Sequence, residues 1–274
     1  MTSRSDSAHP WLIDPVTGPI APEVPLPNAP LVRVIAQVTF PVVTSILKPE
    51  FIGPFQEAIR ETYTDLSWIE AETTAISAGP DGIAVKGTGG IWRFQTPGVG
   101  WLVSLAPHFV AVEAVAYTSR ADFLRRLRQV LEALAEHVKP RTVQRLGVRY
   151  VDRLPESCLP EMSQLVRPEV LGVTAMPLSG RLALSITESV FRLDGGQMTT
   201  RWGLVPPNAT YDPGAIEPQP AASWVLDLDM FRLEPRRFET DALVAEASGF
   251  SERIYTVFRW AVTDQFLARF GGKP

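Results

Sequence analysis

The chain has 274 residues, of which 45% are apolar and 20% are charged, and its formal net charge is −4. This composition excludes wholesale disorder, and the near-balanced charge gives no global attraction to nucleic acid or to an anionic membrane. The single cysteine, Cys158, excludes an internal disulfide, and with three histidines it leaves little material for a structural zinc site.

The first 30 residues carry seven prolines and no apolar segment of the kind that a secretory signal needs. Because each proline fixes φ and removes a donor, we expect neither helix nor strand there, but an extended, partly mobile arm. A passive tail is the favoured interpretation, since termini are usually poorly ordered unless tied down. The alternative is that its apolar residues, such as Trp11 and Leu26, let the arm lie along the folded body or along a second subunit. The chain also lacks a run of roughly 18 apolar residues that could span a bilayer. We therefore expect a cytoplasmic protein with no membrane partner.

After the arm, residues 31–40 predict a strand and residues 50–65 predict a helix, which has apolar side chains at intervals of four. Short segments rich in β-branched and aromatic residues follow, separated by Gly- and Pro-rich turns, and predict an antiparallel meander. These predicted strands are 73–77, 83–86, 91–96, 101–105 and 109–117.

The clearest predicted helix begins after Ser119, a good N-cap residue followed three positions later by Asp122, and it ends before Pro140. Residues 142–152 then alternate strictly and predict a strand. That alternation places Arg145, Gly147 and Arg149 on one side.

Residues 155–180 are rich in proline and glycine, which predicts a linker. Strands are predicted at 181–193, 197–205 and 223–232, with a proline-rich loop at 206–222, and a C-terminal amphipathic helix follows. Each half is thus a run of antiparallel strands followed by a long helix, an order that predicts an α+β fold with helices on one face of an antiparallel sheet. The expected organisation is an arm (1–30), a first half (31–154), a divider (155–180) and a second half (181–274), and the two halves can share one sheet.

Asp227 and Asp229 lie two positions apart in a predicted strand, so both carboxylates fall on one face. Two such carboxylates, with Glu188 as a third, could hold Mg²⁺ for phosphoryl transfer. They could equally pair with arginines on neighbouring strands, since opposite charges across strands stabilise a sheet. The pairing is the favoured interpretation, and we expect no metal and no catalytic residue.

Arg145, Arg149 and Arg201 are the strand arginines available for such pairing. Guanidinium groups also suit recognition of phosphate or carboxylate groups, so a binding role for these residues is an alternative to a salt-bridged face. Gly147 between the first two would permit close approach of another group.

Other chemistries have weaker support. The Gly-rich segment 87–90 lacks the features of a phosphate loop, His108 has no partner nucleophile motif, and Cys158 has no activating neighbour. The arginines of the first long helix are interspersed with glutamates, which favours a solvated face over a nucleic-acid contact. No cofactor is expected.

Several segments resemble the TIGR04255 family, a sporadically distributed family of bacterial proteins. The resembling segments are 30–41 (PLVRVIAQVTFP), 117–123 (YTSRADF), 145–154 (RLGVRYVDRL), 225–229 (VLDLD) and 258–264 (FRWAVTD). One departure is FSER at 250–253, where similar proteins often have a Leu-His-Glu stretch. The family has no settled activity, so the resemblance implies no catalytic residue. Its patchy occurrence is typical of accessory genes in mobile or defence islands.

From these observations we expect a non-catalytic binding or regulatory protein that contacts a protein partner or another copy of itself, such as a component of a bacterial defence or toxin–antitoxin type module. The alternatives are a Mg²⁺-dependent phosphoryl-transfer or nuclease enzyme built on Asp227, Asp229 and Glu188, and a small-ligand-binding protein. In the last case a cavity between sheet and helices would be lined by Trp92, Trp101 and Trp224.

Overall fold

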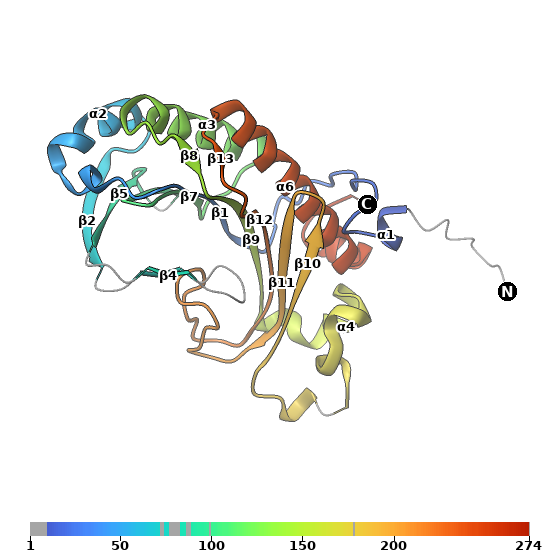
Figure 1. Cartoon of the computed structure of the whole chain (residues 1–274). Coiled ribbons are helices and arrows are strands. Elements are labelled where there is room, and N and C mark those ends of the chain that lie inside the picture. Colours follow the sequence, from blue (N-terminus) through green and yellow to red (C-terminus); the bar gives the residue numbers. More distant parts are fainter. Residues whose placement is uncertain are drawn as a thin grey trace.

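The structure is a computed structural model that describes residues 10–71, 74–76, 83–85, 89–98, 100–177 and 179–273. The fold is α+β, as predicted. Its centre is a nine-stranded antiparallel sheet with the strand order β10-β11-β12-β9-β1-β7-β6-β5-β2 (Figure 1). The strands of this sheet are β1 (Leu31–Thr39), β2 (Asp65–Ala71), β5 (Gly89–Gln95), β6 (Trp101–Ala106), β7 (Phe109–Ala114), β9 (Arg145–Pro155), β10 (Ser185–Leu193), β11 (Gly196–Val205) and β12 (Ser223–Arg232).

Two small two-stranded sheets accompany the large one. They pair β3 (Thr74–Ile76) with β4 (Ile83–Val85), and β8 (Thr142–Val143) with β13 (Arg236–Arg237). One of the predicted Gly- and Pro-rich turns, at 78–82, and residues 87 and 88 of the Gly-rich segment lie outside the described residues.

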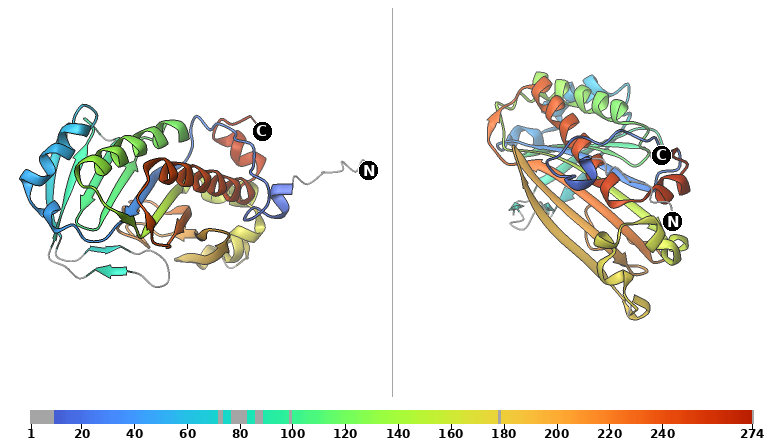
Figure 2. Two further views of the ribbon diagram at one scale, coloured as in Figure 1. Left: turned by 45° about the horizontal axis from the view of Figure 1, so that its top comes forward. Right: turned by 90° about the vertical axis from the view of Figure 1, so that its right-hand side faces the viewer.

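Three helices cover one face of the sheet and lie next to one another in the order α2, α3, α6 (Figure 2). Shorter helices lie at the edges of the molecule. The α-helices are α1 (Pro10–Ile13), α2 (Pro49–Ile59), α3 (Arg120–His137), α4 (Met162–Leu165), α5 (Pro168–Leu171), α6 (Thr240–Ala261) and α7 (Asp264–Arg269), and the 3₁₀ turns are η1 (Thr44–Leu47), η2 (Glu156–Glu161), η3 (Gly172–Ala175) and η4 (Ser179–Arg181). Among the described residues, no helix has both the length and the apolar character needed to cross a bilayer.

Helix α3 begins where its sequence predicts. The Ser119 hydroxyl accepts a hydrogen bond from the backbone N–H of Asp122 at 3.1 Å, which satisfies one of the free donors of the first turn. The predicted apolar stripe, including Phe123, Leu127 and Leu134, is buried against the sheet and the neighbouring helices. The main core therefore lies between the helix layer and the sheet.

The two predicted halves are joined within the sheet, because β9 pairs with β1 on one side and with β12 on the other. Residues 155–180 were predicted to be a linker or divider, and the linker interpretation is wrong. Cys158, Leu165 and Val170 in this segment are buried in the main core, and the backbone N–H of Arg167 donates to the carbonyl of Ala261. The prolines mark turns and helix starts between apolar residues, and these apolar residues pack on the C-terminal helices.

The prediction that the arm contains no helix is also wrong, because α1 begins at Pro10. A proline at the first position of a helix loses no hydrogen bond, since that N–H would be free in any case. The favoured interpretation of the arm as a passive tail is wrong for its described residues, which lie along the folded body. Trp11 is buried, and the backbone N–H groups of Ala21 and Val24 donate to Thr256 Oγ1 at 3.0 Å and to the Tyr255 hydroxyl at 2.6 Å. Residues 1–9 of the arm lie outside the described residues.

Candidate functional site

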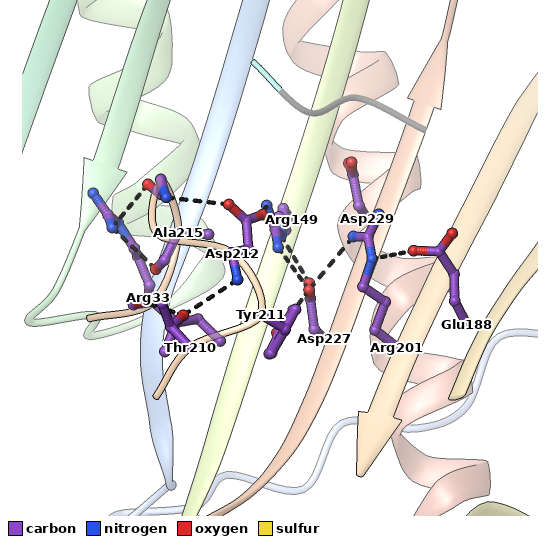
Figure 3. A network of polar contacts seen from close by, with 12 residues as sticks. Arg33, Arg149, Glu188, Arg201, Thr210, Tyr211, Asp212, Ala215, Asp227 and Asp229 are labelled. Carbon is purple, nitrogen blue, oxygen red and sulfur yellow. Dashed lines mark hydrogen bonds and ion pairs between the residues drawn. The ribbon is translucent and has the colours of Figure 1, made fainter. Parts of the chain in front are cut away.

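The face of the sheet opposite the helices carries the strand charges that the sequence singles out (Figure 3). On β12, Trp224, Leu226 and Leu228 belong to the core under the helices, so Asp227 and Asp229 project from the other face, as the alternation predicts. Both carboxylates are buried, with 0% and 6% of the residue exposed. Burial of two charges is tolerated only where other groups compensate them.

Asp227 is the centre of a network of charges. Arg149 binds it with two hydrogen bonds, from Nε to Oδ1 at 2.8 Å and from Nη2 to Oδ2 at 2.6 Å. Arg201 Nη1 lies 3.6 Å from Oδ2, and the Tyr211 hydroxyl donates to the same oxygen at 2.9 Å. Burial lowers the pKa of Arg149, but the charge of Asp227 and its hydrogen bonds outweigh that effect and raise the pKa well above its usual value. This arginine therefore stays charged.

Asp229 pairs with the third arginine, Arg145. Arg145 Nη2 lies 3.2 and 3.4 Å from the two carboxylate oxygens, and the guanidinium carbon lies 4.7 Å from the centre of the Phe231 ring. Gly147 provides the space, because a Cβ at this position would come within 2.5 Å of Arg145 Nη1. The group expected to approach Gly147 closely is therefore the Arg145 guanidinium. Burial raises the pKa of Asp229 despite the nearby arginines, which fits its long hydrogen bonds.

Glu188, the third carboxylate of the hypothetical Mg²⁺ site, is directly opposite Arg201, and Arg201 is directly opposite Asp227. The guanidinium thus stands between the two carboxylates, and it ion-pairs with Glu188 through Nε. In the described part of the chain, no three His, Cys, Asp or Glu side chains are grouped so that they could hold a metal ion. The geometry favours the cross-strand pairing of Asp227, Asp229 and Glu188 with arginines.

The loop 206–222 folds back onto this face and completes the network. Asp212 lies 2.8 Å from Arg149 Nη1, and Ala215 and Ile216 pack in a small apolar cluster with Val151 of β9. Tyr211 and Asp212 did not stand out in the sequence. The sequence feature that could have indicated them is a Tyr-Asp pair in the loop between β11, which carries Arg201, and β12, which carries Asp227 and Asp229.

Beside this loop, a groove of about 970 Å³ opens on the same face of the sheet. Its floor is formed by β1, β5, β6, β7 and β9, and residues 215–217 and 219–222 of the loop form one wall. Apolar side chains such as Leu31, Leu102 and Ile216 alternate there with charged ones. The volume is in the range of ligand-binding clefts.

Three arginines line the groove, and their states differ. Arg33 is satisfied, because it ion-pairs with Glu113 and donates to the carbonyl of Ala215 at 3.0 Å. Arg93 and Arg153 have no ion pair with any described carboxylate, and the Nε of each is buried without a hydrogen-bond partner. Arg153 Nη2 donates to the carbonyl of Glu217 at 2.9 Å, while burial lowers the pKa of its guanidinium. These two arginines are the incompletely satisfied cations of the groove.

Sequence reasoning did not select Arg93 or Arg153 as candidates. Both lie on strands, and the absence of a carboxylate partner becomes visible only once the order of the strands is known. Arg145, Arg149 and Arg201, the strand arginines singled out in the sequence, are all paired with carboxylates.

The remaining candidate residues from the sequence are packed, buried or paired within the fold. His108 packs against the Phe109 ring, Cys158 is buried, and Arg125 ion-pairs with Asp122 on α3. Trp224 is in the main core, and Trp92 donates from its ring N–H to the carbonyl of Ile46 at 2.7 Å.

No protein-family model matches the chain, and no curated protein shows significant similarity to it.

Proposed function

We propose that the protein is a non-catalytic binding protein, and that its groove receives a segment of a partner protein containing acidic side chains. Arg93 and Arg153 carry this proposal, because both line an open groove of about 970 Å³ and neither guanidinium has an ion pair with a described carboxylate. A carboxylate from a ligand would supply the missing counter-charge through charge-assisted hydrogen bonds.

The lining of the groove favours a protein segment over a nucleic acid. Carboxylates from Glu113, Glu156 and Glu217 line it together with the three arginines, so its charge is balanced. A polyanionic backbone would meet repulsion from these carboxylates. A peptide with one or two acidic residues among apolar ones would match both the arginines and the apolar floor.

In this proposal the chain acts in the cytoplasm through protein contacts, as a regulatory or partner-recognition component. The resemblance to a sporadically distributed bacterial family supports a place in a defence or toxin–antitoxin type module. A second copy of the chain is the alternative partner, and sedimentation analysis of the purified protein distinguishes the two.

The test uses fluorescein-labelled peptides in which two glutamates are separated by varied apolar spacers. We expect fluorescence anisotropy to show binding to the native protein, and at least about tenfold weaker binding when Arg93→Gln and Arg153→Gln are combined, because two charge-assisted hydrogen-bonding groups are lost. Peptides with glutamine in place of glutamate should lose affinity to the same extent.

The matched control combines Arg60→Gln with Arg125→Gln. These arginines lie at the end of α2 and on α3, on the helix side of the sheet, and are mostly exposed. Their substitution removes the same total charge as the groove variant. Equal loss of binding in both double variants, or no loss in either, would overturn the proposed groove.

A further inference from the structure

A second cavity, of about 450 Å³, lies on the helix side of the sheet beneath the N-terminal arm. The arm lines it through residues 23–27 and 29, and the start of β1, β9, β12, α6 and the start of α3 supply the remaining walls. The backbone bond from Val24 to the Tyr255 hydroxyl fixes the arm to α6 at this point. Leu31, at the start of β1, lines both this cavity and the groove.

Asp152 is the unusual residue of this cavity. It is only 6% exposed, yet its carboxyl makes no hydrogen bond or ion pair with any described residue. The two other buried aspartates, Asp227 and Asp229, each meet an arginine. Burial, together with the charge of Asp227 beyond the sheet, raises the pKa of Asp152 to about 7. A buried carboxyl without a partner is unfavourable unless a ligand supplies one.

The other polar side chains that line the cavity are mainly hydroxyls. The hydroxyls of Tyr117 and Tyr150 lie 3.4 Å apart, and Tyr255 and Ser251 line the α6 side. The one cationic side chain among the lining residues is Arg120, which already pairs with Glu23 at 3.0 Å and with Glu252 at 3.6 Å. The charges of Asp152 and Glu23 therefore exceed that of Arg120, and the cavity favours a cation.

We propose that this cavity binds a small organic molecule that carries a protonated amine on an aromatic body, with the ammonium group against Asp152 and the ring among the tyrosines. The ammonium group supplies the missing counter-charge. The faces of tyrosine rings attract a nearby cation, and the apolar residues Leu228, Ile254 and Phe258 accommodate the body of the ligand. No other described carboxylate combines burial, absence of a partner and a place in a cavity.

The test measures binding of tyramine and tryptamine by isothermal titration calorimetry. The matched ligand control is 4-ethylphenol, which keeps the ring of tyramine and lacks the amine. We expect both amines to bind, and 4-ethylphenol to bind at least about tenfold more weakly, because it leaves Asp152 without a counter-charge.

Two variants act on the cavity in different ways. Asp152→Asn keeps the shape and removes the charge, and should weaken amine binding by at least about tenfold. Ser251→Leu keeps Asp152 and fills part of the cavity from α6, and should weaken the amines and 4-ethylphenol alike. Asp65→Asn, an exposed position at the start of β2, is the matched control and should leave binding unchanged.

Binding should also depend on pH, since the amine pairs with the ionised carboxylate. With a pKa of about 7, amine affinity should rise about tenfold from about pH 6 to about pH 8. The charged or titratable groups that line the cavity with Asp152 are Tyr117, Tyr150, Tyr255, Arg120 and Glu23, and the charge of Asp227 acts on the Asp152 carboxyl from across the sheet. Tyr117, Tyr150 and Tyr255 have pKa values raised by burial, so they stay neutral in this range.

The proposal is overturned if neither amine binds in the millimolar range, if 4-ethylphenol binds as tightly as tyramine, or if Asp152→Asn binds the amines as the native protein does. Because Ser251→Leu does not alter the carboxyl, its effect remains informative if the aspartate variant fails to fold. Unchanged amine affinity in Ser251→Leu would place the bound amine elsewhere.

Discussion

Asp227 lies where three strands and a loop meet. Two arginines compensate its charge, and a tyrosine donates a hydrogen bond to it. Breaking a buried ion pair by removing one partner costs about 3–5 kcal/mol, because the remaining charges stay buried without compensation. We therefore expect Asp227→Asn to lower the free energy of unfolding by several kcal/mol in urea denaturation, whereas Asp65→Asn should have little effect. Unchanged stability with loss of a Mg²⁺-stimulated phosphoryl-transfer activity would instead support the enzymatic alternative.

The raised pKa of Asp152 predicts that the stability of the fold depends on pH. Its pKa is about 7 in the folded chain and near 3.8 in the unfolded one, so the folded state holds the extra proton between these values. Raising the pH through this window lowers the free energy of unfolding, by as much as about 4 kcal/mol for three pKa units. Asp152→Asn removes this dependence.

Urea denaturation of both proteins between about pH 5 and pH 8 checks this prediction, since the window spans the interval over which a carboxyl with raised pKa titrates. The variant should gain stability relative to the native protein as the pH rises. A constant difference across the range would show that Asp152 does not titrate as stated.

At the residue scale, alternation along a strand predicted which face each carboxylate and arginine occupies, because the period of two is a local property of the backbone. It could not identify partners. Arg149 binds Asp227 although Asp229 is the residue directly opposite, and Asp152 is unpaired although its own strand, β9, contains three arginines. Such choices depend on side-chain reach and on strand order, which are not local.

At the scale of the element, the arm is held by backbone hydrogen bonds to side chains of α6. Thr256 accepts from the N–H of Ala21, and both residues are buried. Thr256→Val keeps the shape and leaves that N–H without a partner, at a cost of about 1–3 kcal/mol. We expect faster amide hydrogen exchange in residues 10–30 and no change in α3.

Thr187→Val, at an exposed position on β10, is the control for this substitution. If exchange in the arm is the same in Thr256→Val and in Thr187→Val, the bond to Thr256 does not hold the arm.

The elements with strong local signals were predicted well. Helix α3 has its N-cap at Ser119, and β12 spans the residues expected from alternation. Residues 155–180 were misjudged because proline and glycine content is typical of linkers, while the apolar residues between the prolines pack only once α6 and α7 are present. The predicted strand at 142–152 is divided into β8 and β9 at Gln144, since β8 pairs with β13 and not within the large sheet.

At the scale of the whole molecule, the sheet runs without interruption across both predicted halves. The contact between β9 and β12 is as extensive as that between hairpin neighbours, and it carries the pairs of Arg145 and Arg149. We expect one cooperative unfolding transition in calorimetry, and no stable fold for fragments 31–154 or 181–274 alone. Two separate transitions, or a folded fragment, would contradict this expectation.

The strand order also bears on how the chain leaves the ribosome. Strand β9 is synthesised well before β12, so Arg145 and Arg149 emerge before the carboxylates that will neutralise them. In that interval β9 is an unpaired edge, and its positive charges repel the same strand of a neighbouring nascent chain. We therefore expect the arginines of the finished ion pairs to oppose edge-to-edge association of nascent chains.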